Sequence, residues 1–231
     1  MDTATAKEFH HWNWFDGPQY TRPMSYLDID RFVATPLVAE PFPYMIVPGF
    51  LRPRTMAAIT GDFPRIVQAG SFPVSELTVG PVFGAFLEEL RGPAFRDAAA
   101  AKFGEDLADL PDMVTIRGRA RAKDGQIHRD SKTKIITVLI YMNGQWEAPG
   151  GRLRLLRTED NLEDVIAEVP PDEGTLLAFR VTPNSWHGHH PFVGERRVIQ
   201  LNWVTSQDVV RHEQRRHSLS ARLKRMLPFG S

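Results

Sequence analysis

The segment Thr133–Asn143, TKIITVLIYMN, constrains the fold of this chain more than any other. It is a nearly continuous run of β-branched and aliphatic residues, which is typical of a strand buried on both faces. Similar short runs follow at Gly150–Arg157, Thr175–Val181 and Arg196–Thr205, and Met113–Ala120 precedes it with the alternation of a half-exposed strand. At least five strands within about 90 residues predict an all-β barrel or sandwich.

The first half of the chain has a different character. Residues 1–41 are aromatic and dotted with proline, so we expect an irregular arm there. Phe42–Leu51 predicts a short buried strand. Three helices are then expected, because proline suits the first helical turn and glycine the residue after the last. They begin at Pro53, Pro81 and Pro93, and the last two end near Gly92 and Gly104.

The tail predicts a basic helix over Gln207–Leu227, with one apolar face made of Leu219, Leu223, Met226 and Leu227. Such a face could be solvated or could form a homodimer. We therefore expect one structural unit in three parts. Residues 1–110 supply an arm, a strand and supporting helices, residues 111–206 form the β core, and residues 207–231 form the helix.

Composition excludes several classes of protein. The chain has no cysteine, which rules out disulfides, zinc fingers, iron–sulfur clusters and thiol nucleophiles. Its formal net charge is zero, so no nucleic-acid partner is expected. The first residues lack the apolar region of a secretory signal, and no apolar run is long enough to span a membrane. We expect a cytoplasmic protein.

A His-Arg-Asp triplet lies just before the most buried strand. In protein kinases these letters open the catalytic loop, where an Asn five residues after the Asp holds a metal ion. Here that position is Ile135, and no glycine-rich phosphate loop precedes the triplet. The triplet therefore does not indicate a kinase.

The same triplet can supply two ligands for a metal. Residues i and i+2 of an extended segment point to the same side, so His128 and Asp130 project together. Downstream lie three further histidines, His187, His189 and His190, and then Arg196 and Arg197. Two histidines and one carboxylate form the facial triad of non-haem Fe(II) oxygenases, which leaves coordination positions open.

Residues 113–205 resemble the 2-oxoglutarate- and Fe(II)-dependent dioxygenases, in particular their prolyl-hydroxylase-like branch. That family carries His-x-Asp, a distal His roughly 50 to 60 residues later, and an Arg or Lys about nine or ten residues further on. In this chain His187 follows His128 by 59 residues and Arg196 follows His187 by nine. Other matching features are Pro191, the IYMN and GGRLRLL strands, and the opening FPYMIVPGFL.

The resemblance implies a mainly β fold with flanking helices, a double-stranded β-helix (a jelly-roll or cupin-like barrel). It implies Fe(II) on His128, Asp130 and His187, with 2-oxoglutarate and O₂ as co-substrates and succinate and CO₂ as products. Arg196 would bind 2-oxoglutarate, with Arg197 as the alternative, and Tyr141 would assist. His189 and His190 would lie next to the ligands or on the substrate side. The substrate would be hydroxylated: an amino-acid residue of a peptide, a free amino acid, a sugar or another metabolite.

Two other functions remain open from the residues alone. A metal-binding jelly roll without turnover would keep the barrel without needing the arginine. A zinc hydrolase could use the same His₂Asp set, but it would need a carboxylate base as well. Three upstream arginines, Arg117, Arg119 and Arg121, could line the mouth of a cavity or face solvent, and solvent is the favoured reading.

Overall fold

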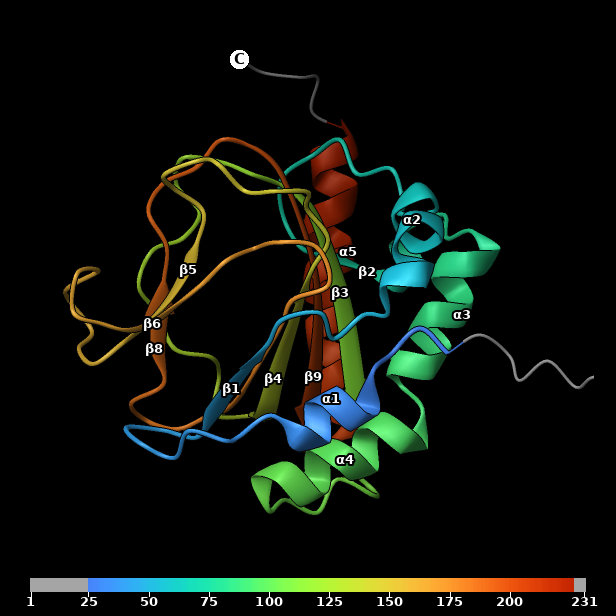
Figure 1. The fold of residues 1–231 in the computed structure, drawn as a ribbon. Coiled ribbons are helices and arrows are strands. Elements are labelled where there is room, and N and C mark those ends of the chain that lie inside the picture. Colours follow the sequence, from blue (N-terminus) through green and yellow to red (C-terminus); the bar gives the residue numbers. More distant parts are fainter. Residues whose placement is uncertain (1–24, 227–231) are drawn as a thin grey trace, which may run out of the picture.

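The computed structural model describes residues 25–226, with side chains up to residue 216. Within this range a six-stranded sheet and a three-stranded sheet face each other, and helices cover the outer side of the larger sheet (Figure 1). All strand pairs within both sheets are antiparallel.

The larger sheet has the strand order β1-β7-β4-β9-β3-β2. Its central strands are long and apolar, because both faces of this sheet are covered. In sheet order its strands are β1 (Tyr44–Val47), β7 (Leu176–Arg180), β4 (Lys134–Tyr141), β9 (Gly194–Val204), β3 (Asp112–Ala120) and β2 (Phe72–Pro73).

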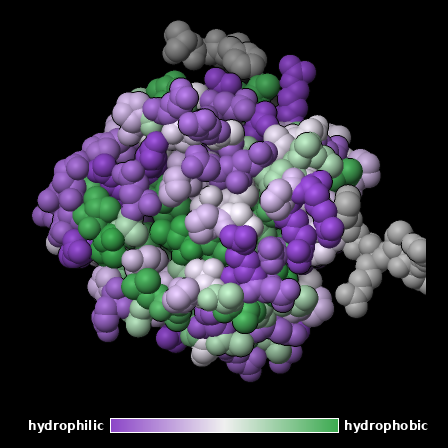
Figure 2. All heavy atoms as spheres, in the orientation of Figure 1, coloured by the Kyte–Doolittle hydropathy of each residue, from purple (hydrophilic) through white to green (hydrophobic). Residues whose placement is uncertain are grey.

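The smaller sheet has the order β6-β5-β8. Its strands are β5 (Leu153–Leu156), β6 (Val165–Val169) and β8 (Trp186–Gly188). Strand β5 was predicted, but β6 and β8 were not, because β6 has no alternation of apolar and polar residues and β8 has only three residues. Viewed from the same side, the molecule is mostly hydrophilic, and apolar residues show mainly between the smaller sheet and β1 (Figure 2).

The predicted helices are confirmed. They are α2 (Pro53–Gly61), α3 (Pro81–Leu90) and α4 (Pro93–Phe103), each with proline in its first turn. Helix α4 ends at Gly104, whose φ of +65° is a left-handed conformation that glycine adopts without steric strain. A 3₁₀ turn, η1 (Val74–Glu76), follows β2.

The expected irregular arm is wrong for part of its length. Residues 29–34 form α1 (Ile29–Ala34), in which the Asp28 side chain accepts a hydrogen bond of 3.1 Å from the Arg31 backbone N–H. The helix buries Phe32 completely. Six residues are too few to show a helical period in the sequence. Residues 1–24 lie outside the described range.

Two apolar clusters lie on the two sides of the larger sheet. The first packs α1–α4 against the outer face, with Phe32, Phe50, Phe95 and Trp203 in edge or tilted contacts. The second lies between the sheets and contains Tyr141 and Phe179. Strand β3 is therefore more buried than the half-exposed strand expected, since Met113, Val114, Thr115 and Ile116 are all at most 8% exposed.

Helix α5 (Gln207–Met226) confirms the helix expected at the tail. The side chains of Leu219, Leu223, Met226 and Leu227, which were predicted to form its apolar face, lie outside the described residues. The described helices include none that is both long and apolar enough to cross a membrane.

The predicted division into three parts is not tested by the structure and stays a prediction. Strands β1 and β2 come from before residue 111, so the larger sheet contains strands from both of the first two predicted parts.

Candidate metal and co-substrate site

The two sheets enclose a cavity of about 550 Å³. Residues of β3, β4, β9, β5 and β8 line it, and the first turns of α5 close one side. His128, Asp130 and His187 all line this cavity, and so does Arg196. The structure therefore brings together residues that are up to 68 positions apart in the sequence.

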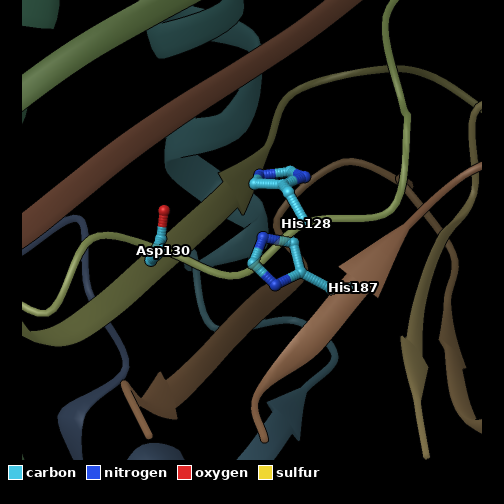
Figure 3. A group of neighbouring side chains, drawn as sticks. All are labelled: His128, Asp130 and His187. Atoms are coloured by element: carbon cyan, nitrogen blue, oxygen red, sulfur yellow. The ribbon is translucent and has the colours of Figure 1, made fainter. Parts of the chain in front are cut away.

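Backbone pairing holds the two histidines side by side. The His128 N–H donates to the His187 carbonyl and the His187 N–H to the His128 carbonyl, each at 2.9 Å. His128 lies on the loop before β4 and His187 on β8. Their ring centroids are 4.3 Å apart, and both rings point to the same space as Asp130 (Figure 3).

The three side chains can hold one metal ion. One ligand atom from each of His128, Asp130 and His187 lies within 4.8 Å of the other two. Nδ1 of His128 is 2.9 Å from the Gln126 carbonyl, and Nδ1 of His187 is 3.0 Å from the Ser185 carbonyl. A carbonyl accepts only from a protonated nitrogen, so in each ring Nε2 is left with the lone pair that binds a metal.

The protonation states of the two buried groups also suit a cation. Burial and the neighbouring His128 together lower the pKa of His187 to about 4, so His187 is neutral at pH 7. Burial alone would raise the pKa of Asp130, but Lys134, His187 and a hydrogen bond from Thr137 together hold it below its usual value. Asp130 is therefore a carboxylate and His187 a neutral imidazole, and these are the forms that metal ligation requires.

A chain of polar side chains orients Asp130. Lys134 lies 2.7 Å from its Oδ1, and the Thr137 hydroxyl donates to Oδ2 at 2.5 Å. Asn202 then donates to the Thr137 hydroxyl at 2.8 Å. Each carboxylate oxygen still has a second lone pair for a cation. Thr137 and Asn202 were not predicted, although Thr137 interrupts the apolar run of β4 and Asn202 lies between Leu201 and Trp203 of β9.

Removing the hydroxyl that orients Asp130 is expected to weaken metal binding. For Thr137→Val we predict a rise of about 10- to 100-fold in the dissociation constant for Mn(II), the range for groups that support a ligand. Thr137→Ser keeps the hydroxyl and should restore wild-type affinity. Thr115→Val makes the same change elsewhere on the cavity wall and should leave the affinity unchanged. Equal losses in the valine and serine variants would show that the hydroxyl does not act through Asp130.

Arg196 and Arg197 point to opposite faces of β9. Arg196 is 7% exposed, donates from Nε to the Gly151 carbonyl at 2.8 Å and lies over the Tyr141 ring, 5.5 Å from its centroid. Arg197 lies over Phe63 on the helix side and pairs with Glu195 at 2.8 Å. Arg196 is therefore the arginine available to a ligand in the cavity.

Tyr141 lies against Arg196 but is fully buried and does not itself line the cavity. Within the described residues its hydroxyl has no hydrogen-bond partner. Burial raises the pKa of the phenol, and the charge of Arg196 opposes this only in part, so the hydroxyl stays a donor. A buried donor without an acceptor is unusual, and beside a guanidinium it fits a carboxylate.

The two remaining histidines differ from each other. His189 lines the cavity and is 7% exposed, and burial lowers its pKa to about 4. His190 turns outward, 2.8 Å from Glu163 and 2.9 Å from Arg154. Of the three upstream arginines, Arg119 and Arg121 are exposed, as expected, whereas Arg117 lines the cavity. The expectation of solvent was wrong for Arg117.

Comparison with known proteins finds a family that is similar to the core. Residues 118–205 match the family model described as the 2OG-Fe(II) oxygenase superfamily. No curated protein sequence matches the chain.

Solved structures resemble the chain in fold. A prolyl-4-hydroxylase from Pseudomonas putida is 16% identical with a TM-score of 0.51, over 77% of this chain and 97% of that one. A viral collagen prolyl hydroxylase from Paramecium bursaria Chlorella virus-1, in complex with 2OG, is 13% identical with a TM-score of 0.49, over 70% and 96%. The first likeness confirms the predicted double-stranded β-helix.

Proposed function

We propose that the protein hydroxylates a C–H bond at Fe(II) held by His128, Asp130 and His187, because residues 118–205 match the 2OG-Fe(II) oxygenase superfamily. The observation that carries the proposal is the cluster of three ligand atoms within 4.8 Å on the wall of a cavity that Arg196 also lines. When bound, Fe(II) supplies the redox centre at which O₂ is consumed. The overall reaction converts a substrate C–H, 2-oxoglutarate and O₂ into the alcohol, succinate and CO₂.

The chain's own residues fix the geometry of that reaction. His128 and His187 present Nε2 because the Gln126 and Ser185 carbonyls hold the Nδ1 protons. Asp130 is held by Lys134 and Thr137. Three protein ligands within 4.8 Å of one another leave positions open for the co-substrate and for O₂.

Arg196 is proposed to bind the distal carboxylate of 2-oxoglutarate. Its Nε is already occupied by the Gly151 carbonyl, which fixes the plane of the guanidinium and leaves its terminal nitrogens for a carboxylate. Tyr141 supports the guanidinium with its ring and can donate its unpaired hydroxyl to the same carboxylate. The apolar side chains of Leu139, Leu153 and Val198 line the cavity as well and limit the access of water to it.

The two rival functions are less well supported. A zinc hydrolase needs a carboxylate base in addition to its ligands. The cavity lining offers two carboxylates, Asp130 and Glu213; the first is a proposed ligand and the second is ion-paired with Arg216 at 2.5 Å. A binding module without turnover does not require a co-substrate site, and so it does not explain the buried Arg196 beside the unpaired hydroxyl of Tyr141.

The proposal is tested by co-substrate turnover. Protein purified without oxygen, loaded with Fe(II) and then exposed to air should release succinate from 2-oxoglutarate, faster when a substrate is present. Zn(II) in place of Fe(II) should give no succinate, because zinc has no redox chemistry. Absence of succinate with Fe(II) across a broad panel of substrates would contradict an oxygenase.

The substrate class follows less directly. The structure from Pseudomonas putida is a prolyl-4-hydroxylase, and a peptide is one candidate that this likeness suggests. A small molecule is the other, and the cavity volume of about 550 Å³ favours it. A cytoplasmic location, the absence of a nucleic-acid partner and a homodimer through α5 stay predictions.

A further inference from the structure

The cavity carries more positive charge than the proposed reaction accounts for. Five cationic side chains line it: Arg117, Arg129, Lys134, Arg196 and Arg216. The two carboxylates of the lining, Asp130 and Glu213, are already paired with Lys134 and Arg216. Three guanidinium groups are left without a carboxylate from the cavity wall.

Two of these three have an evident role. Arg196 is the proposed partner of 2-oxoglutarate. Arg129 is held at the rim, where it donates to the Pro183 carbonyl at 2.9 Å and lies over the Trp186 ring. Arg117 is the third, and the described part of the structure gives its guanidinium neither a hydrogen bond nor an ion pair.

The backbone aims Arg117 into the cavity beside Arg196. On β3 it follows Thr115, which faces the same way, and it pairs with Val198 of β9. A β-bulge follows: Arg196 and Arg197 together lie opposite the single residue Gly118. Arg196 is thus the diagonal neighbour of Arg117 across the two strands, within reach of long side chains.

The surroundings of Arg117 leave its charge poorly compensated. Burial lowers its pKa, Asp124 raises it, and the charge of Arg196 lowers it again. Asp124 is committed elsewhere, since it accepts from the Arg121 backbone N–H at 2.9 Å and pairs with the Arg121 guanidinium at 3.2 Å. An arginine stays charged in such surroundings, so a bound anion would supply the missing partner.

Resting on the proposed function, we infer that Arg117 binds an acidic group of the substrate, and that the substrate is a compact anionic molecule carrying a carboxylate or a phosphate. The guanidinium fork matches either group with two parallel hydrogen bonds. A cavity of about 550 Å³ must hold this molecule together with 2-oxoglutarate, which favours a small molecule. Thr115 and Gln200, paired across β3 and β9, provide neutral hydrogen-bonding groups beside it.

The test measures binding to protein loaded with Zn(II) and 2-oxoglutarate, which cannot turn over. One panel holds free amino acids and short hydroxy acids, each with its amide. A second holds sugar phosphates, each with its unphosphorylated sugar. Thermal stabilisation by an anion but not by its neutral counterpart is expected in one of the two panels, and this identifies carboxylate or phosphate as the group. Calorimetry then gives the affinity.

Three variants assign the effect. Arg117→Gln should weaken binding of that anion at least about tenfold, the usual loss for a hydrogen bond to a charged group, and should leave binding of 2-oxoglutarate within about twofold. Arg117→Lys keeps the charge without the fork and should bind with intermediate affinity. Arg119→Gln removes an exposed arginine of the same strand, and this variant should bind the anion with wild-type affinity.

Each contrary result has a distinct meaning. Failure of 2-oxoglutarate to bind the zinc-loaded wild type would count against the proposed function itself. If 2-oxoglutarate binds normally and no anion in either panel stabilises the protein, the inference about Arg117 is overturned. It is also overturned if the neutral counterparts bind as well as the anions, or if Arg117→Gln weakens 2-oxoglutarate tenfold, because Arg117 would then serve the co-substrate.

Discussion

Replacing Arg196 by glutamine is expected to raise the dissociation constant of 2-oxoglutarate by about 10- to 100-fold, because a hydrogen-bonded charge pair contributes about 1.5–3 kcal/mol. The guanidinium is buried, is fixed by the Gly151 carbonyl and lines the cavity. Glutamine keeps a donor but removes the charge and the fork. Calorimetric titration of 2-oxoglutarate into metal-loaded protein without oxygen measures the effect.

The adjacent arginine is the matched control. Arg197 lies over Phe63 on the outer face of the sheet and pairs with Glu195, so Arg197→Gln should bind 2-oxoglutarate within about twofold of wild type. A loss in Arg197→Gln together with normal binding in Arg196→Gln would reverse the assignment. Similar losses in both would indicate a change in β9 rather than a lost contact.

Removal of any one of the three ligands is expected to have a larger effect still. Groups that only support a metal ligand contribute about 10- to 100-fold to affinity, so His128→Ala, Asp130→Ala and His187→Ala should each weaken Fe(II) binding by more than about 100-fold. Succinate formation should fall to the level of the metal-free protein. Equilibrium dialysis of Fe(II) without oxygen, followed by a turnover assay, measures both.

The neighbouring histidines decide whether the distal ligand is assigned correctly. His190 turns away to Glu163 and Arg154, so His190→Ala should keep wild-type Fe(II) affinity. His189 lines the cavity but does not belong to the three-residue cluster, and His189→Ala should keep the metal too. Loss of Fe(II) in His189→Ala with retention in His187→Ala would move the distal ligand by two residues.

Much of the fold could be predicted, because many of its strands are continuous apolar runs and most of its helices begin with proline. Continuous apolar runs predict the central strands, and proline in the first turn predicts α2, α3 and α4. Strand β8 and helix α1 could not be predicted, because three strand residues and six helix residues are fewer than two periods of their patterns. Strand β6 could not be predicted either, because its sequence VIAEV does not alternate between apolar and polar residues. Their positions depend on pairing with distant segments.

Alternation alone did not decide whether Arg196 or Arg197 faces the cavity. The other residues of β9 indicate which of the two does. In β9 the residues in step with Arg197 are Ile199, Leu201 and Trp203, which pack against the helices. Those in step with Arg196 include Gln200 and Asn202, which line the cavity. Two polar residues on one face of a buried strand indicate a cavity on that side, and they place Arg196 there as well.

Arg117 illustrates the limit of the same reasoning. It shares a short stretch with Arg119 and Arg121, and a run of arginines at alternate positions is typical of a solvated face. Arg117 lines the cavity, whereas Arg119, which lies beyond the bulge in the pairing of β3 with β9, is exposed. A bulge depends on how two strands pair, and neither strand reveals it alone.

The most direct test of the account is whether 2-oxoglutarate binding depends on Fe(II). Calorimetry without oxygen should show tight binding of 2-oxoglutarate to the Fe(II)-loaded wild type. Binding should be weak or undetectable to the metal-free protein and to Asp130→Ala mixed with Fe(II). Equal binding with and without the metal, or none in either state, would contradict a site in which His128, Asp130 and His187 hold the ion that the co-substrate chelates.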